Sequence, residues 1–334
     1  MQKKKMKIAV LGATGNVGRT LLQILNERGF HASQITAIAS QHSAGGEISY
    51  GDEHTLRVHA LESFAFHGMD VVLSSLDGAL TQTVAPRITS AGAILIDNSS
   101  AFRMEKNIPL VIPEVNPEDI KLADKKIIAS PNCSMIALAV ALKPLDNLVK
   151  ISRVVVSTYQ SVSGAGKGAM DELYNQTRAI YMNTSVKAEY LPKPIAFNII
   201  PHIDDIEDSG DTGEEIKIIS EFQKVMHRAI PTTATAVRVP VFIGHCASVN
   251  ITFDSEITVA QAQSCLKNAP GVRLLSNFET YSTPTEVTGE DAVFISRLRH
   301  DSSTRHGLNL WIAFDNLRKG AALNVVQILE LLIK

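Results

Sequence analysis

The stretch "ASPNCSMIALAVALKPL", from Ala129 to Leu145, contains a cysteine in a setting that indicates chemistry. Cys133 follows a Pro-Asn pair and precedes a run of helix-forming residues. At the N-terminus of a helix the dipole favours the thiolate, and the thiolate is the form of cysteine that attacks a carbonyl carbon. The alternative is structural: a small apolar side chain beside a buried helix. This stretch on its own leaves both interpretations open.

Three glycines near the start of the chain are spaced as in a phosphate-binding turn. In "LGATGNVGRT", Gly12, Gly15 and Gly18 follow the predicted strand "KIAVLG" and open the predicted helix "NVGRTLLQILNERG", which we expect to end at Gly29. Glycine lets the backbone approach a pyrophosphate, and the helix N-terminus supplies N–H groups and a positive dipole. A turn without a ligand is the alternative, but the position between strand and helix favours a dinucleotide.

The residues after the next predicted strand bear on the choice between NAD and NADP. An acid there would bond the ribose 2′-hydroxyl of NAD, whereas a polar or basic cluster would receive the 2′-phosphate of NADP. The strand "ITAIAS" leads into Ser40, Gln41, His42 and Ser43, with no acid among them. The pattern favours NADP, with His42 as the only possible cation of this cluster.

A thiolate and a hydride cofactor together suit one kind of reaction. They can oxidise an aldehyde through a thioester or, in reverse, reduce an acyl phosphate. The thiolate attacks the carbonyl carbon, and hydride then leaves or arrives at that carbon. The chemistry also requires a general acid–base, and a charged substrate requires cations that hold it.

The elements that must position these residues alternate between strand and helix in the first part of the chain. Hydrophobic patterns predict strands at 7–12, 35–40, 70–76, 93–100 and 126–132, and helices at 16–29, at 80–92 and from 133 onward. Such alternation predicts a parallel sheet with helices on both faces. Ligands of such sheets collect at the carboxyl ends of the strands, where Cys133 would lie.

Longer strands of alternating polarity predict a different second domain. We expect strands at 153–164, 233–244, 247–255, 292–301 and 307–316, helices at 166–182, 214–227 and 319–334, and an irregular proline-rich segment at 191–205. The fold class is therefore α/β, with a Rossmann-like dinucleotide-binding domain and an α+β domain whose sheet is mainly antiparallel. The final apolar helix needs a covering partner.

Composition excludes several classes of function. The chain has 334 residues, 45% of them hydrophobic and 20% charged, with a net charge of -2, so it lacks the basic footprint of a nucleic-acid or membrane-surface binder. Its longest uncharged apolar stretch, Met135 to Leu142, is far shorter than a membrane span, and no signal peptide is apparent. Three scattered cysteines suit neither a disulfide framework nor a metal site, so we expect a cytoplasmic protein without a metal.

Ten strings distributed along the chain resemble aspartate-semialdehyde dehydrogenases in content and order. They are "LGATGNVG", "ASQHSAG", "IDNSSAFRM", "VIPEVN", "SPNCS", "TYQSVSGAG", "PIAFNIIP", "EEIK", "VRVPVFIGH" and "DNLRKGAALN". The resemblance extends from Ile8 to the final helix. Several of the strings are long and unusual in composition, which makes their shared order specific.

The resemblance implies roles for the residues around the thiol. Cys133 in "PNCS" corresponds to the nucleophile of the family, and Gln160 in "TYQSVSGAG" to the residue that orients the substrate beside it. His245, at the end of "RVPVFIGH", corresponds to the acid–base. These three positions form the expected catalytic set.

Five further positions correspond to the residues that hold the substrate. Arg238 resembles the arginine that grips the substrate carboxylate, and Glu214 the partner of its amino group. Lys217 and Arg103 resemble the two phosphate-binding cations, with Asn132 nearby. Without the resemblance, an internal ion pair for Arg238 and an exposed helical pair for Glu214 and Lys217 would be the simpler interpretations.

The resemblance also implies the cofactor, the domain ranges and the assembly. We expect NADP to be bound by Gly12, Thr14, Gly15, Asn16, Val17, Ser40, Gln41, His42, Ser43, Ser163, Gly164 and Asn316. The NADP-binding domain would comprise 1–132 and 316–334, and the catalytic and dimerisation domain 133–315. A homodimer, or a dimer of dimers, would reduce L-aspartyl 4-phosphate reversibly to L-aspartate 4-semialdehyde in aspartate-family amino-acid biosynthesis.

Two other functions remain as alternatives. An N-acetyl-glutamyl-phosphate reductase has the same chemistry, but its acylated amino group would not need an acid such as Glu214. A catalytically silent relative would tend to have lost the cysteine, the histidine or a cation, and all are present here. The family pattern also changes at Ser130 and Met135, which flank the nucleophile, and at His42, where a lysine or arginine is usual.

Overall fold

The computed structural model describes residues 6–277 and 279–333, which form two compact units. The first unit contains the chain up to Asn132 and from Ala321 onward, and the second runs from Cys133 to Gly320. The second unit therefore extends past 315, the end that the sequence suggests for it. Residues 1–5, 278 and 334 of the expected domain ranges lie outside the described residues.

The first unit is built on a seven-stranded sheet with the order β3-β4-β2-β1-β5-β6-β7. Every neighbouring pair is parallel except β3 and β4, which form an antiparallel hairpin at one edge. The central strands read as short apolar runs because both of their faces are buried. The strands are β1 (Ile8–Leu11), β2 (Ile35–Ala39), β3 (Glu47–Tyr50), β4 (His54–Ala60), β5 (Val71–Ser74), β6 (Ile94–Asp97) and β7 (Ile127–Ala129).

The parallel sheet confirms the Rossmann-like prediction, but the sequence did not indicate the β3–β4 hairpin. The exposed positions of these two strands carry charged and polar residues, and only alternate side chains are buried. Such alternation is typical of half-buried strands, but here it extends over only 4 and 7 residues and gives a weak signal.

Helices α1 (Asn16–Glu27), α2 (Gly78–Ser90) and α8 (Leu323–Ile333) pack in this unit. The apolar α8 contacts α1 and β6, so the first unit itself buries the C-terminal helix. Asn324 fixes its position, because its Nδ2 donates to the carbonyl of Val111 over 3.0 Å and to Oγ of Ser130 over 2.9 Å. The chain thus returns at its end to complete the first unit.

The second unit contains a six-stranded sheet with the order β11-β12-β13-β10-β8-β9. The three inner pairings are antiparallel and the two outermost are parallel, so the prediction of a mainly antiparallel sheet is confirmed. The expected strand at 233–244 ends at Arg238, although Val239, Val241 and Phe242 keep backbone hydrogen bonds with residues 160–163. The strands are β8 (Ile151–Gln160), β9 (Thr232–Arg238), β10 (His245–Phe253), β11 (Val272–Leu274), β12 (Val293–His300) and β13 (Gly307–Phe314).

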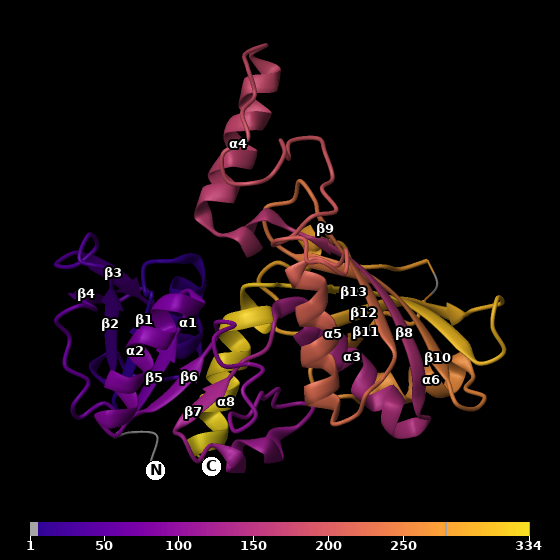
Figure 1. Cartoon of the computed structure of the whole chain (residues 1–334), viewed down its shortest axis with the longest axis horizontal. Helices are drawn as coiled ribbons and strands as arrows, with labels where there is room; N and C mark the ends of the chain where they lie inside the picture. The colour runs from indigo at the N-terminus through magenta and orange to yellow at the C-terminus, as the bar shows by residue number, and fades with distance from the viewer. Residues whose placement is uncertain (1–5, 278, 334) are drawn as a thin grey trace. The chain divides into compact units, whose positions relative to one another are not determined.

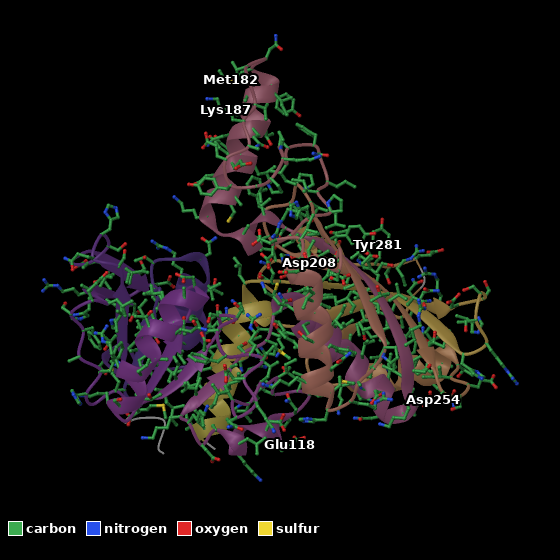
Figure 2. The ribbon with its side chains drawn as sticks, in the orientation of Figure 1. Glu118, Met182, Lys187, Asp208, Asp254 and Tyr281 are labelled. Carbon is green, nitrogen blue, oxygen red and sulfur yellow. The ribbon has the colours of Figure 1, made fainter. Side chains whose placement is uncertain are left out.

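Helices α3 (Cys133–Leu148), α5 (Gly213–Met226) and α6 (Val259–Lys267) pack against this sheet and against one another. Figure 1 shows α4 (Lys167–Tyr181) projecting away from the strands. Met182 and Lys187 lie toward the tip of this projection in Figure 2. A short helix, α7 (Pro284–Val287), precedes β12, and a π-helical turn at Arg318–Ala322 replaces the first turns of the expected helix at 319–334.

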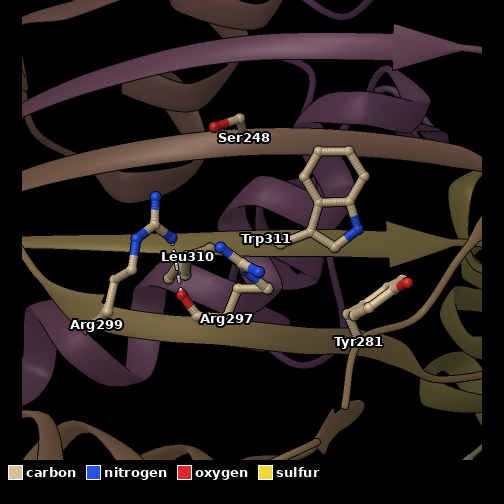
Figure 3. Close-up of a pocket in the computed structure, with 6 residues that line it drawn as sticks. All are labelled: Ser248, Tyr281, Arg297, Arg299, Leu310 and Trp311. Carbon is tan, nitrogen blue, oxygen red and sulfur yellow. Dashed lines mark hydrogen bonds between the residues drawn. The ribbon is translucent and has the colours of Figure 1, made fainter. Parts of the chain in front are cut away.

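The side of the six-stranded sheet away from α3 presents partly exposed polar and aromatic residues. Ser248 of β10 is exposed, and the rings of Tyr159 and Trp311 lie 5.4 Å apart on neighbouring strands. A cavity of about 340 Å³ opens here beside Trp311 (Figure 3). The irregular pairing between Ser296 and Arg299 brings two guanidinium groups to this cavity, and Arg299 donates to the carbonyl of Arg297 over 3.0 Å.

Within residues 6–277 and 279–333, the structure contains no helix that is both long enough and apolar enough to cross a membrane.

Candidate active site

Cys133 is the first residue of α3 and is half-buried. The helix continues to Leu148, so its N-terminal N–H groups and dipole favour a negative charge on the sulfur. The chain also passes close to this residue at Gly320, where an added Cβ would lie 3.0 Å from Cβ of Cys133. Any side chain at position 320 would therefore crowd the thiol.

Gln160 links the segment of the thiol to an acid on another helix. It is the last residue of β8 and is only 2% exposed. Its Nε2 donates to Oγ of Ser134 over 2.9 Å and to Oε1 of Glu214 over 2.8 Å. The amide thus joins the residue next to Cys133 with the carboxylate of α5.

The start of α5 presents an acid and a cation on one face. Thr212 caps the helix in a capping box with Glu215, which places Glu214 in the first turn. Glu214 is buried, and Lys217, three residues later, forms an ion pair with Asp204. The ammonium group expected to bind phosphate therefore already holds a carboxylate.

Arg238 lies at the end of β9 and is 6% exposed. Its Nη1 donates to the carbonyl of Ser161 over 2.9 Å, while Nε has no hydrogen-bond partner among the described residues. Burial lowers the pKa of Arg238, and the charges of Glu214, Cys133 and Asp204 act in the opposite direction. A buried guanidinium with an unsatisfied donor is suited to an anionic ligand.

His245 is the first residue of β10 and is completely buried. Its Nδ1 accepts from the backbone N–H of Ser161 over 3.2 Å and lies 3.0 Å from Oγ of the same residue. Its Nε2 has no hydrogen-bond partner among the described residues. Burial, followed by repulsion from Arg238, lowers the pKa of His245 well below 6.5, so the imidazole is neutral near neutral pH.

Gly164 brings the backbone against both of these groups. A Cβ added to Gly164 would lie 3.0 Å from Nη1 of Arg238 and 3.2 Å from Nε2 of His245. Ser163 and Asn316, expected to bind the cofactor, lie in the same unit and bond to each other, since Nδ2 of Asn316 donates to Oγ of Ser163 over 2.9 Å. This unit thus brings together the residues from the second half of the expected site.

The glycine turn lies in the first unit between β1 and α1. Gly12 has a φ of +71°, and a Cβ on Gly18 would lie only 2.0 Å from the carbonyl oxygen of Gly12. These two positions therefore require glycine. Gly15 is the N-cap of α1 and has no side chain that could accept from its first N–H groups, so Thr14, Gly15, Asn16 and Val17 surround a helix start suited to a phosphate.

The cluster expected at the 2′-phosphate follows β2 in a turn. Ser40, Gln41 and His42 are exposed and Ser43 is half-buried. The structure adds an acid to this cluster, because the N–H of Gln41 lies 3.4 Å from Oε1 of Glu62. Glu62 follows β4, which pairs with β2, and so sequence proximity could not indicate it.

Arg103 and Asn132 also belong to the first unit. Arg103 is 8% exposed and its Nη2 donates to the carbonyl of Asn98 over 2.8 Å. Asp97 at the end of β6 holds this loop by accepting from N–H and Oγ of Ser99 over 2.9 and 2.8 Å. Burial raises the pKa of Asp97, while the bonds from Ser99 and the charge of Arg103 oppose the rise.

The expected residues therefore form two sets, each within one unit. The second unit brings together Cys133, Gln160, Ser163, Gly164, Glu214, Lys217, Arg238, His245 and Asn316, and the first holds the glycine turn, residues 40–43, Arg103 and Asn132. The sequence did not indicate roles for Ser134, Ser161 and Asp204, which bond to members of the second set. The only local signal was their position within or beside the recurring strings.

The other two cysteines differ from Cys133. Cys246 is 2% exposed and packs with Val287, Phe294 and Ala313, and burial raises the pKa of its thiol to about 12. Burial also raises the pKa of Cys265. Neither residue begins a helix.

An α/β unit with a glycine turn and an α+β unit that gathers a thiol, an imidazole and a guanidinium define a two-domain oxidoreductase that works through a cysteine. Residues 7–123 match the family model for the semialdehyde dehydrogenase NAD binding domain, and residues 142–319 match that for the semialdehyde dehydrogenase dimerisation domain. The chain belongs to the aspartate-semialdehyde dehydrogenase family.

The alignments with individual relatives extend over almost the whole chain. The aspartate-semialdehyde dehydrogenase of Rickettsia conorii is 50% identical over 333 residues, with 99% of this chain and 98% of the relative covered. That of Aquifex aeolicus is 46% identical over 334 residues, with 98% of each covered. The crystal structure of aspartate semialdehyde dehydrogenase II from Vibrio cholerae superposes with a TM-score of 0.96 at 41% identity, with 98% of each chain covered.

Proposed function

We propose that this protein catalyses the reversible reduction of L-aspartyl 4-phosphate to L-aspartate 4-semialdehyde, with release of phosphate, as a step of aspartate-family amino-acid biosynthesis. The observation that carries the proposal is the cluster of Cys133, Gln160, Glu214, Arg238 and His245 within the second unit. A structure of the Vibrio cholerae relative complexed with ASA supports the same substrate class.

Cys133 supplies the nucleophile of the proposed reaction. Its thiolate attacks the acyl carbon of aspartyl phosphate, the carbon–oxygen bond to phosphate breaks, and an aspartyl thioester remains. A bound nicotinamide cofactor supplies the hydride that reduces this thioester. The resulting thiohemiacetal releases the aldehyde and returns the thiol, and His245 serves as the acid–base group at the substrate oxygen.

Charged side chains hold the two ends of the substrate. The unsatisfied Nε of Arg238 suits the substrate carboxylate, and Glu214, held by Gln160, suits the ammonium group. Lys217 would release Asp204 and bind the phosphate group, and Arg103 and Asn132 are the further proposed phosphate partners. This assignment explains the buried acid, which the acylated amino group of N-acetyl-glutamyl phosphate would not require.

The cofactor is proposed to be NADP, bound by the first unit. The positive φ of Gly12 and the uncapped start of α1 at Gly15 suit a pyrophosphate, with Thr14, Asn16 and Val17 beside it. Ser40, Gln41, His42 and Ser43 would receive the 2′-phosphate, and Glu62 opposes this charge. Ser163, Gly164 and Asn316 of the second unit would face the nicotinamide.

The protein is further proposed to be a homodimer, or a dimer of dimers, in the cytoplasm. The match of residues 142–319 to a dimerisation domain supports assembly through the second unit. The sheet side with Tyr159, Ser248 and Trp311 is the proposed contact, since its side chains are partly exposed. Ser248→Arg should therefore reduce the mass measured by light scattering to that of a monomer, while Ser90→Arg on α2 should leave it unchanged.

The test of the activity is NADP-dependent oxidation of L-aspartate 4-semialdehyde, followed at the nicotinamide absorbance with and without phosphate. Turnover that depends on phosphate is the expected result. Folded protein that turns over neither NADP nor NAD with this aldehyde would contradict the proposal. Turnover of the N-acetyl-glutamyl substrate in its place would assign the alternative reaction.

A further inference from the structure

A closed set of buried hydrogen bonds lies behind His245, on the side away from its unsatisfied Nε2. It joins Ser161, Ser163 and Asn316, all of which are at most 3% exposed. Oγ of Ser161 lies 3.1 Å from Oγ of Ser163 and 3.2 Å from Oδ1 of Asn316, and Nδ2 of Asn316 donates to Oγ of Ser163 over 2.9 Å. The three side chains therefore form a ring of polar contacts.

Two backbone N–H groups give this ring its direction, because a backbone N–H can only donate. The N–H of Gly244 donates to Oδ1 of Asn316 over 2.9 Å, which fixes the orientation of the amide. With Nδ2 donating to Ser163, the hydroxyl of Ser163 is directed to Ser161, and the hydroxyl of Ser161 is directed to Nδ1 of His245, 3.0 Å away, rather than to the more distant Oδ1 of Asn316. Each polar group of the ring then has a partner.

The second backbone donor acts on the histidine itself. The N–H of Ser161 points at Nδ1 of His245 over 3.2 Å, so Nδ1 must carry the lone pair. A proton on Nδ1 would face both this N–H and the hydroxyl of Ser161, which is directed at the same nitrogen over 3.0 Å. The neutral imidazole therefore carries its proton on Nε2, the nitrogen next to Gly164 and Arg238.

We propose that Ser161 and Asn316 are positioning residues that hold His245 as the tautomer with its proton on Nε2, so that His245 meets the substrate oxygen as a neutral hydrogen-bond donor. The inference deepens the proposed function and rests on it for the substrate oxygen. It also gives Asn316 a role apart from the cofactor, because both polar atoms of its side chain are engaged in the ring.

The charges around the site agree with a neutral donor. Burial disfavours a positive charge on His245 and lowers its pKa, Arg238 on β9 acts in the same direction, and a hydrogen bond with the backbone of Gly244 opposes both. Glu214 on α5, Cys133 on α3 and Asp204 act on Arg238. A neutral donor in a dry site can stabilise negative charge that develops on a carbonyl oxygen without itself becoming charged.

The tautomer can be tested in the full-length resting protein by NMR with ¹⁵N-labelled histidine, with the signal assigned by its loss in His245→Gln. We expect the bound proton on Nε2 and a bare Nδ1 between about pH 5.5 and 8.5, the range in which an ordinary histidine titrates. A proton on Nδ1, or titration within this range, would overturn the proposal. Because this measurement needs no turnover, its result is independent of whether the proposed activity is found.

Variants test the positioning role. Ser161→Ala should give a mixture of tautomers and lower kcat by about tenfold or more, with the Kd for NADP unchanged. Asn316→Ala should shift the tautomer in the same direction, because it removes the Nδ2 donor that orients Ser163, and it provides a second variant should Ser161→Ala fail to fold. A fall in kcat with an unchanged tautomer would overturn the positioning role. A rise in the Kd for NADP of Asn316→Ala that matches its fall in kcat would show that Asn316 acts by binding the cofactor.

Discussion

Nε2 of Gln160 lies 2.8 Å from the carboxylate of Glu214, although the two residues are 54 positions apart in the chain. The same amide nitrogen bonds Ser134, the neighbour of Cys133. A buried carboxylate is thereby held in a fixed place near the thiol, and a substrate ammonium group bound to it would be placed relative to the nucleophile.

This relationship predicts that Glu214→Gln raises KM for L-aspartate 4-semialdehyde by about 30-fold, because one charge-assisted bond contributes about 2 kcal/mol. Gln160→Ala should act partly through Glu214, so the double variant should lose less than the sum of the two single losses, by about 1 kcal/mol. Steady-state kinetics of the four proteins measure this coupling, with Glu207→Gln on an exposed loop as the control. Fully additive losses would contradict the link.

Cys133 should be the thiol that reacts at neutral pH. Burial raises the pKa of Cys246 to about 12 and also raises that of Cys265, so both remain protonated there. We expect rapid labelling of one thiol, its loss in Cys133→Ala and its retention in Cys265→Ala. Cys133→Ala should also abolish turnover and leave cofactor binding intact, and residual turnover in that variant would refute the covalent mechanism.

Replacement of Arg238 by lysine should show that a single positive charge is insufficient to bind the substrate carboxylate. The guanidinium uses Nη1 for the carbonyl of Ser161 and retains Nε for a ligand, and an ammonium group cannot reproduce this geometry. Arg238→Lys should lower kcat/KM by about 30-fold, or about 2 kcal/mol. Arg273→Lys, at an exposed ion pair with Glu290, is the control, and equal kinetics in the two variants would argue against the assigned role.

Gly164→Ala should reduce activity without unfolding the protein. The backbone of Gly164 is outside the left-handed region, so alanine introduces no backbone strain. Its methyl group would nevertheless lie 3.0 Å from Arg238 and 3.2 Å from His245, where the substrate oxygen and carboxylate would bind. We expect kcat/KM to fall at least about tenfold with little change in Tm. Gly46→Ala, where contact is ordinary, should keep wild-type kinetics, and an unaffected Gly164→Ala would place the substrate elsewhere.

Glu62→Gln should strengthen the binding of NADP. The carboxylate lies beside Gln41 in the cluster proposed to receive the 2′-phosphate, and its removal would relieve repulsion between two negative groups. We expect the Kd for NADP to fall about threefold, as for an exposed charge pair, with the Kd for NAD nearly unchanged. Calorimetric titration of both cofactors measures this, with Glu53→Gln as the control. An equal change in the Kd for NAD and for NADP would show that Glu62 does not lie near the bound 2′-phosphate.

Local patterns were sufficient to predict the two kinds of sheet. The buried run at Ile8–Leu11, the glycines after it and the amphipathic helix from Asn16 are neighbours in the chain, so their periodicity and turn chemistry can be read directly. The start of α3 at Cys133 is equally local. The β3–β4 hairpin escaped prediction because its strands have only 4 and 7 residues, so the alternation of each is short.

The sequence by itself determined the glycine turn, the placement of Cys133 at a helix start and the family resemblance, since each depends on adjacent residues. Only the tertiary structure decided which residues form hydrogen bonds with one another across the chain. Oγ of Ser161 reaches His245 across 84 positions and Asn316 across 155, and Glu62 reaches Gln41 from a strand that pairs only in the folded sheet. Such bonds depend on strand register and on the return of the chain from β9, which no local pattern encodes.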